Sequence, residues 1–177
     1  MWVVDGMKEL NWKYIKNSEL LSSFLYKIAE IKEQHWKYGI DSQLQWVMYN
    51  MTDNDYHILG LNEQNQILAY ASIVCIKVTI NEKLNNCYGV GCVCVDKNIE
   101  GQGYGKKLLE KINLFMEHNA KIGFLLCKES LVSFYKKSNW KEVSYTNAIV
   151  SQQQFNLKIM SFPDVIDCNH IAIDRNF

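Results

Sequence analysis

The sequence predicts an α/β fold in which about six to seven strands form a sheet flanked by about four helices. Apolar residues recur at two spacings, in short continuous runs typical of buried strands and at the spacing typical of amphipathic helices. With 177 residues, of which 48% are hydrophobic, the chain can bury a sizeable core. Its single proline is Pro163, and no linker, internal repeat or low-complexity tract interrupts the sequence. We therefore expect residues 1–177 to form a single domain.

After a first strand, the N-terminal half predicts two helices and then two strands. Apolar residues at helical spacing between positions 20 and 31 mark the first helix, with Asn17 or Ser18 as its expected N-cap. The second helix follows at once, with Asp41 or Ser42 as its expected cap. A polar turn at residues 62–65 joins the two predicted strands, Tyr56–Leu61 and Ile67–Ile80. Late strands are expected at residues 140–145 and 155–161.

Residues 88–112 are the most informative part of the chain, because they predict a buried strand, a glycine-rich loop and the start of a helix. The apolar run ends at Val95, and the next helix begins near Tyr104. Between them lie Gly101, Gly103 and Gly105. Alternate glycines let the backbone approach a ligand and turn its N–H groups into one concavity, and a helix N-terminus adds a positive dipole end. This pattern favours phosphate binding, although three glycines also suit a plain strand-to-helix turn.

Two common phosphate-binding motifs do not match this loop. A dinucleotide fingerprint, Gly-x-Gly-x-x-Gly, needs its last glycine where this chain has Lys106 or Leu108, depending on the starting glycine. A Walker A loop needs a glycine in place of Glu100 and a serine or threonine in place of Lys107. Both nucleotide-binding readings therefore fail.

The remaining pattern resembles motif A of the GCN5-related N-acetyltransferases (GNAT), usually Arg/Gln-x-x-Gly-x-Gly/Ala after an apolar strand. Residues 100–105, EGQGYG, match its glycines and place Glu100 at the Arg/Gln position. Residues 123–140 resemble motif B, a short strand and a helix ending in Phe134-Tyr135, with Asn139-Trp140 where Gly-Phe is usual. The order of predicted elements extends the resemblance to nearly the whole chain, whereas the two motifs cover only its central part.

The resemblance implies a mixed, mostly antiparallel twisted sheet, and transfer of an acetyl group from acetyl-CoA to a primary amine by direct attack in a ternary complex. It assigns the pyrophosphate to backbone N–H groups of the loop and the pantetheine amides to the edge of the preceding strand. It also assigns Tyr135 as the general acid that protonates the departing thiolate. The implied cofactor-binding residues are Cys94, Val95, Gly101, Gly103, Gly105 and Lys106.

The general base has no clear candidate in the sequence. Many relatives carry a glutamate on the strand before the glycine loop, and the corresponding position here is Gly89. No acidic residue lies between Tyr88 and Val95. A chain of water molecules could take this role instead.

The expected acceptor is a small amine held by residues outside the glycine loop. The segment His35-Trp36-Lys37-Tyr38 joins the two N-terminal helices, a region that commonly borders the acceptor site in the family. Its aromatic rings suit cation–π contact with an amine, and they equally suit an aromatic anchor at a helix end. The C-terminal segment is distantly similar to that of the aminoglycoside 2′-N-acetyltransferases. It is either an acidic wall for a cation or a solvated end of the chain, with Asp164, Asp167, Asp174 and the terminal carboxylate of Phe177.

Composition argues against several other classes of function. The 19 basic and 19 acidic residues give a net charge of zero, so we expect neither a nucleic acid nor an acidic membrane as partner. No apolar run has the length of a secretory or membrane-spanning segment, which predicts a cytoplasmic protein. The six cysteines lack a Cys-x-x-Cys pair, so we expect buried thiols and no metal site.

Three alternatives to a small-molecule acetyltransferase stay open at this level. A non-catalytic acyl-CoA sensor on the same fold would agree with Glu100 in the loop and with the missing strand acid. A protein or peptide N-acetyltransferase would share the cofactor loop, and an unrelated α/β interaction domain would use the glycines and Tyr135 only as architecture. A homodimer is one expected assembly, and residues 1–6, which precede the second methionine Met7, are expected to be a dispensable tail.

Overall fold

The computed structural model describes residues 8–151, 156–165 and 168–177. The chain divides into two compact units. Unit 1 contains the chain up to Ala71 and residues Cys92–Leu108, whereas unit 2 contains Ser72–Gly91 and Leu109–Phe177. Two strands and one helix therefore contribute to both units, and these are β3 (Ile67–Ile80), β4 (Lys83–Val95) and α3 (Tyr104–His118).

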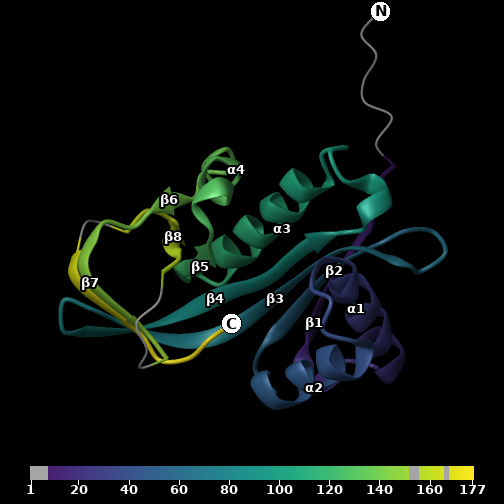
Figure 1. Cartoon of the computed structure of the whole chain (residues 1–177), viewed down its shortest axis with the longest axis horizontal. Helices are drawn as coiled ribbons and strands as arrows, with labels where there is room; N and C mark the ends of the chain where they lie inside the picture. Colours follow the sequence, from purple (N-terminus) through teal and green to yellow (C-terminus); the bar gives the residue numbers. More distant parts are fainter. Residues whose placement is uncertain (1–7, 152–155, 166–167) are drawn as a thin grey trace, which may run out of the picture. The chain divides into compact units, whose positions relative to one another are not determined.

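Unit 1 combines an antiparallel part of the sheet with two helices (Figure 1). β1 (Asn11–Lys16) pairs with β2 (Tyr56–Leu61) along their whole lengths, and the hydrogen-bonded order continues through β3 to β4. α1 (Ser22–His35) and α2 (Ile40–Asn50) lie beside one another. The spacing of apolar residues on α1 gives the helix one buried side. Its core cluster with β2, β3 and β4 consists of Ile28, Ile31, Leu59, Leu61, Ile67, Tyr70 and Cys94.

Unit 2 continues the sheet from β3 and β4 through further strands. β5 (Gly123–Cys127) pairs parallel with β4 and antiparallel with β8 (Lys158–Phe162), which also pairs with β6 (Lys141–Glu142). β9 (Cys168–Ile173) pairs antiparallel with β3, and β7 (Tyr145–Val150) adds to β9 in parallel. The buried cluster of this unit consists of Val74, Ile76, Val78, Cys87, Phe124, Val143, Val150, Ile159, Cys168, Ile171 and Ile173.

The predicted fold class is confirmed, since the chain forms a mixed, mostly antiparallel sheet with four α-helices among the described residues. The sheet has nine strands in that part of the chain, more than the sequence predicts. The main additional strand is β9. It lies in the C-terminal segment, which the sequence analysis describes only by its acidic residues. Alternate residues of β9 enter the core of unit 2, where Cys168, Ile171 and Ile173 are buried. Much of the C-terminal segment is therefore a sheet strand.

The ends of the elements show where local signals succeed and fail. β2 and β3 have the predicted bounds, Tyr56–Leu61 and Ile67–Ile80. The predicted helix caps are wrong: Asn17 and Ser18 form a 3-10 turn before α1, and α2 begins at Ile40 after Gly39, before Asp41 and Ser42. Asn17 is diverted because its Oδ1 accepts a hydrogen bond from His57 Nε2 at 2.9 Å.

The chain after α4 (Val132–Lys136) turns as the sequence predicts. Asn139 has a φ of 66°, the left-handed conformation that commonly ends a helix. The N–H groups of Ser138 and Trp140 both donate to the Tyr135 carbonyl oxygen, at 2.9 and 3.3 Å. This turn leads the chain from α4 into β6.

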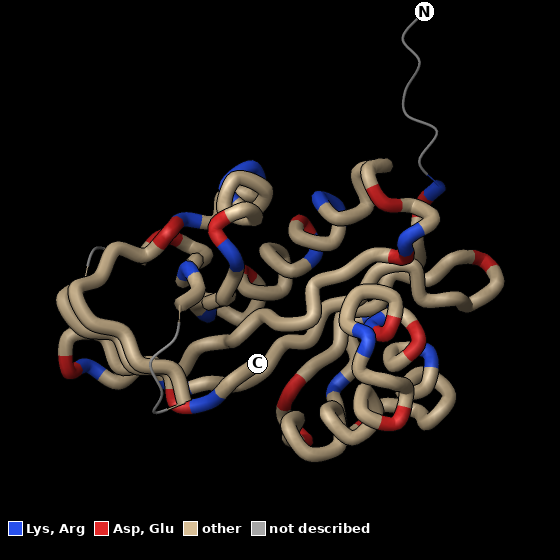
Figure 2. The backbone as a smooth tube through the Cα atoms, viewed as in Figure 1, with Lys and Arg blue, Asp and Glu red and all other residues tan. Residues whose placement is uncertain are grey.

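Charged residues of both signs are distributed along the backbone of each unit (Figure 2). In unit 2, Lys158 Nζ lies 3.0 Å from Glu142 Oε1 and 3.2 Å from Glu129 Oε2, which links β8 to β6 and to the turn before α4. Within the described ranges, no helix combines the length and apolar character that crossing a membrane requires.

Candidate active site

The glycine loop lies in unit 1, between β4 and α3. A 3-10 turn covers Lys97–Ile99, and the chain then passes through Gly101 and Gly103. Both glycines have left-handed backbone conformations, with φ of 75° and 91°, which residues with a Cβ rarely adopt. Apart from chain neighbours, no heavy atom of the described residues lies within 4 Å of a Cβ built on Gly101. The loop therefore leaves open space beside its backbone.

The start of α3 supplies hydrogen-bond donors next to this space. The Lys107 N–H donates to the Gly103 carbonyl oxygen at 3.1 Å. The N–H groups of Tyr104 and Gly105 precede this bond, so helix geometry gives them no intrahelical acceptor. Such donors, at the positive end of the helix dipole, fit the oxygens of a diphosphate. The residues of the loop thus suit the pyrophosphate that the sequence predicts.

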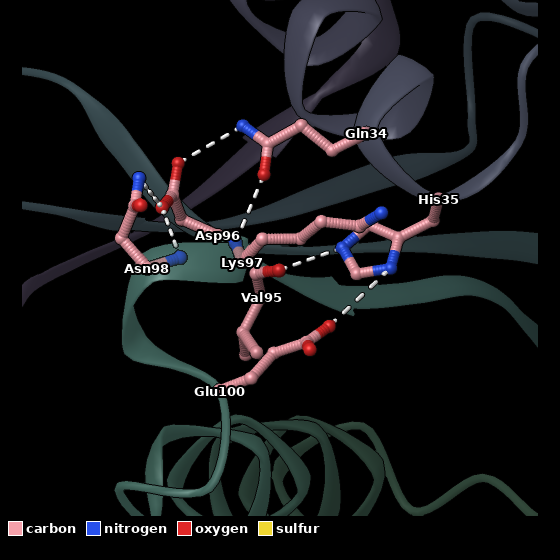
Figure 3. Close-up of polar contacts among 7 residues, drawn as sticks. All are labelled: Gln34, His35, Val95, Asp96, Lys97, Asn98 and Glu100. Atoms are coloured by element: carbon pink, nitrogen blue, oxygen red, sulfur yellow. Dashed lines mark hydrogen bonds and ion pairs between the residues drawn. The ribbon is translucent and has the colours of Figure 1, made fainter.

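Two consecutive side chains at the end of α1 hold the chain that leads into the loop (Figure 3). Gln34 Nε2 donates to Asp96 Oδ2 at 2.9 Å, and Gln34 Oε1 accepts from the Lys97 N–H at 2.9 Å. His35 Nε2 lies 2.7 Å from the Val95 carbonyl oxygen and is the donor, because a carbonyl can only accept. This clamp of Gln34 and His35 positions residues 95–97 ahead of the glycine loop.

His35 also lies beside the glutamate at the start of the loop. Its Nδ1 lies 3.7 Å from Glu100 Oε1, and the Glu100 side chain is 52% exposed. Figure 3 shows the Glu100 side chain pointing toward His35. Because Nε2 keeps its proton for the Val95 carbonyl oxygen, Nδ1 can form an ion pair with Glu100 only when His35 carries a second proton. An exposed carboxylate is also screened by water, so it repels a nearby phosphate less than a buried one does. Glu100, which stands at the Arg/Gln position of motif A, therefore lies beside His35 of α1.

Asp96 shapes the same turn in its ionised form. Partial burial raises the pKa of Asp96, but hydrogen bonds from Gln34 and Asn98 outweigh this effect and place the pKa below its usual value. Asp96 Oδ1 accepts from both the backbone N–H and the side-chain amide of Asn98, each at 2.9 Å. These bonds fix the chain between β4 and Gly101.

Sequence reasoning missed two residues of this region. Gln34 carries no local signal, because a single glutamine on a helix is usually a solvated residue. Lys32 does carry one: it follows Ile28 by four residues and so lies on the apolar side of α1, where it is only 3% exposed.

The three residues predicted to surround the acceptor have different environments. His35 is engaged by the Val95 carbonyl oxygen. Trp36 packs against the core cluster of unit 1, and its carbonyl oxygen accepts from Gln43 Nε2 at 2.6 Å. Tyr38 is 72% exposed. The His35 and Trp36 rings lie beside one another, with centroids 5.7 Å apart, whereas the Tyr38 side chain is exposed.

The remaining predicted residues belong to unit 2. Tyr135 lies on α4, is 7% exposed, and meets the Phe134 ring edge to face at a centroid distance of 5.2 Å. Asp174 Oδ1 accepts from the Lys77 N–H at 2.9 Å, which ties the end of β9 to β3. Asp164 is exposed, and Asp167 lies outside the described residues. The structure thus gives Asp174 a structural partner.

Gly89, where relatives carry a glutamate, also has a structural explanation. A Cβ built there would collide with the Phe177 ring, and one on Gly91 would meet the Phe177 backbone. Phe177 packs against the core cluster of unit 2. Phe177 therefore fills the space that a glutamate side chain at position 89 would need.

Comparisons with known proteins agree with the motif assignment. A family model described as an acetyltransferase (GNAT) domain matches residues 54–142, which is half of the chain. Escherichia coli ElaA has a similar structure, with 21% identity, a TM-score of 0.62, and coverage of 86% of this chain and 98% of that chain.

Two further solved structures show the same fold. An acyl-CoA N-acyltransferase from Pseudomonas aeruginosa has a TM-score of 0.63 at 14% identity, covering 86% of this chain and 99% of that chain. Tetrahymena GCN5 has a TM-score of 0.62 at 13% identity, covering 86% of this chain and 94% of that chain. A comparison with curated protein sequences finds no match. Because the family model spans half of the chain and the fold agrees, this chain belongs to the GCN5-related N-acetyltransferase family.

Proposed function

We propose that this protein transfers the acetyl group of acetyl-CoA to the primary amine of a small molecule by direct attack in a ternary complex. The observation that carries the proposal is the glycine loop of unit 1, with left-handed Gly101 and Gly103 followed directly by the first N–H groups of α3. Family membership supports an acyltransferase built around this loop.

Each residue has a stated task in this proposal. When bound, acetyl-CoA supplies the acyl carbon that the amine attacks and the thiolate that leaves. The N–H groups of Gly101, Gly103, Gly105 and Lys106 hold the pyrophosphate, and the backbone at Cys94 and Val95 lies along the pantetheine. The Tyr135 hydroxyl donates the proton that the thiolate needs. For a phenol of pKa about 10 and a thiol of pKa about 8.5, this transfer is uphill by only about 2 kcal/mol.

Gly103→Asp tests the pyrophosphate cradle. The substitution places a carboxylate and a Cβ at the start of α3, so we expect acetyl-CoA binding to be lost while the fold is retained. Wild-type protein with acetyl-CoA at a hundred times its Kd should be stabilised by about 2.7 kcal/mol, a Tm increase of roughly 5–10 °C. The variant should show no such increase in a thermal-shift assay.

Gly39→Asp is the matched control for Gly103→Asp. Gly39 has a φ of 89° and open space around its Cβ position, so an aspartate there also occupies a backbone conformation that favours glycine, but outside the loop. It should keep the acetyl-CoA shift. A folded Gly103→Asp protein that binds normally would show that the cradle is misplaced, and no shift in wild-type protein would contradict acetyl-CoA as the donor.

Tyr135→Phe tests the general acid. Removing the hydroxyl should lower kcat by roughly 10²–10⁴-fold with an unchanged Kd for acetyl-CoA, the range typical of lost acid catalysis. Tyr145→Phe, a half-buried tyrosine on β7, should leave kcat unchanged. Equal turnover of the Tyr135→Phe and wild-type proteins would end this assignment.

A free-thiol assay with a panel of acceptors tests the substrate class. The panel contains aminoglycosides, polyamines, amino acids, amino sugars and peptide N-termini, and we expect turnover with one of the small amines. A net charge of zero gives no overall field that would attract a long basic chain. Turnover confined to peptide amines would favour the protein N-acetyltransferase, and acetyl-CoA binding without turnover would favour the sensor.

A further inference from the structure

Lys32 on α1 is a buried amine with an unusual set of neighbours. Its side chain is 3% exposed, and its Nζ lies 4.2 Å from the centroid of the Trp46 ring on α2. It also makes a side-chain hydrogen bond with Cys92 on β4. Within the described part of unit 1, no carboxylate forms an ion pair with it. A buried ammonium normally requires an anionic partner, because burial without one is costly.

Cys92 is the thiol that faces this amine. It is partly exposed, whereas Cys94, two residues along β4, is buried. Cys92 lies within β4 and has a φ of 51°, a left-handed conformation that residues with a Cβ rarely adopt. Strained non-glycine residues of this kind are concentrated at functional sites.

The other titratable groups around the pair stay neutral. Burial raises the pKa values of Cys94 on β4 and Tyr70 on β3, and it lowers the pKa of His57 on β2 to about 4. Burial also lowers the pKa of Lys32, and the two cysteines oppose this effect. The Cys92 sulfur is therefore the group of this cluster that can balance a charge on Lys32, and a neighbouring ammonium stabilises a thiolate.

We propose that Lys32 and Cys92 form a nucleophilic pair and that Cys92 is a site of covalent acylation by acyl thioesters. The Cys92 S–H proton passes to Lys32 Nζ, and the Cys92 sulfur attacks the acyl carbon of the thioester. The C–S bond of the donor breaks, and the donor sulfur takes the proton back from Lys32. The products are an S-acyl Cys92 and a free thiol, so the exchange needs no oxidant or reductant. The proposal goes beyond acetyl transfer to an amine and uses the proposed function only for the chemical class of the donor.

The nucleophile is tested with limiting iodoacetamide and peptide mass spectrometry. Cys75 is the internal reference, because it is the other partly exposed cysteine and the remaining four are buried. Because the thiolate is the reactive form, a Cys92 thiol activated by Lys32 should be alkylated about tenfold faster than Cys75 at neutral pH. Lys32→Met should remove this difference, and Lys27→Met, the same change on α1 at a lysine that bonds the Asn65 carbonyl oxygen, should keep it.

Acylation is tested separately with S-acetyl-N-acetylcysteamine, a thioester without nucleotide or pyrophosphate. The expected product is Cys92 carrying one acetyl group, which neutral hydroxylamine removes. Neither reagent uses the glycine loop, so the outcome is independent of whether acetyl-CoA binds there.

Three results would overturn the proposal. Equal alkylation of Cys92 and Cys75, or a Cys92 preference that survives Lys32→Met, would remove the nucleophilic pair. Fast alkylation without acetylation would remove the acylation. If circular dichroism shows that Lys32→Met is unfolded, the pH dependence of alkylation in wild-type protein decides, because the Cys92 rate must level off at lower pH than the Cys75 rate.

Discussion

At the scale of single residues, His57 on β2 shows how burial selects a charge state. It is 0% exposed, its Nε2 donates to Asn17 Oδ1 at 2.9 Å, and its Nδ1 accepts from the Tyr70 hydroxyl at 3.0 Å. Desolvation lowers its pKa from 6.5 to about 4, although Asp55 acts in the opposite direction. The neutral imidazole is therefore the form that the fold requires.

This pKa predicts an acid-sensitive stability. The unfolded chain binds a proton at His57 below pH 6.5 and the folded chain only below about pH 4, so stability is lost as the pH falls between these values. At pH 5 the loss amounts to about 2 kcal/mol. Urea unfolding at pH 7.5 and pH 5 should show this loss in wild-type protein and a smaller one in His57→Gln.

His118→Gln is the control for His57→Gln, because His118 is exposed at the end of α3. It should retain the wild-type difference between the two pH values. The same difference in His57→Gln as in wild-type protein would contradict the linkage.

At the scale of elements, Asn113 joins α3 to the turn after α4 within unit 2. Its Oδ1 accepts from Trp140 Nε1 at 2.9 Å, and its Nδ2 donates to the Ser138 carbonyl oxygen at 2.9 Å. Trp140 is 0% exposed, so its indole N–H cannot turn to solvent if this acceptor is removed. The Asn113 side-chain amide thus gives hydrogen-bond partners to both Ser138 and Trp140 in the turn that follows Tyr135.

Asn113→Ala should therefore lower the free energy of unfolding by roughly 1–3 kcal/mol, the cost of leaving a buried donor without an acceptor. Urea unfolding measures the change. Asn119→Ala removes a similar bond, from Nδ2 to the Phe115 carbonyl oxygen at 2.8 Å, at an exposed position on the same chain segment. It should cost much less, and equal losses in the two variants would mean that Trp140 does not depend on Asn113.

At the scale of the whole molecule, the N-terminal segment raises the question of where the packed chain begins. Residues 1–6 lie outside the described residues. The Lys8 carbonyl oxygen accepts from the Tyr104 hydroxyl at 3.1 Å, and Leu10 is 5% exposed. Lys8 and Leu10 are therefore packed within unit 1.

A chain that starts at Met7 should keep the Tm of the full chain within about 2 °C, which corresponds to less than about 1 kcal/mol, and should keep its activity. A chain that starts at Asn11 also loses the Lys8 acceptor and the Leu10 side chain, and its Tm should fall. Thermal unfolding of both measures the difference. A large Tm loss on removing residues 1–6 alone would show that this segment packs.

Local signals in the sequence were sufficient for several elements. Continuous and alternating apolar residues located β2 and β3 at their observed bounds, because strand formation at these positions follows from side chains a few residues apart. The turns at the glycine loop and at Asn139 could also be predicted from the sequence. The left-handed backbone conformations of Gly101, Gly103 and Asn139 favour glycine and asparagine. The resemblance to the acetyltransferase motifs rests on the same local features, and the family model matches this region.

Tertiary packing determines which distant groups meet, and the sequence alone did not reveal these contacts. His35 reaches the Val95 carbonyl oxygen across 60 residues, and Gln34 reaches Asp96 across 62. The Asn17 side chain, expected to cap a helix, instead accepts a hydrogen bond from His57, 40 residues away. Such contacts depend on how apolar faces pack and on which polar groups burial leaves without water. The preferences of neighbouring residues do not determine how apolar faces pack or which polar groups are buried. The glycine loop could therefore be found from the sequence, whereas the clamp of Gln34 and His35 could not.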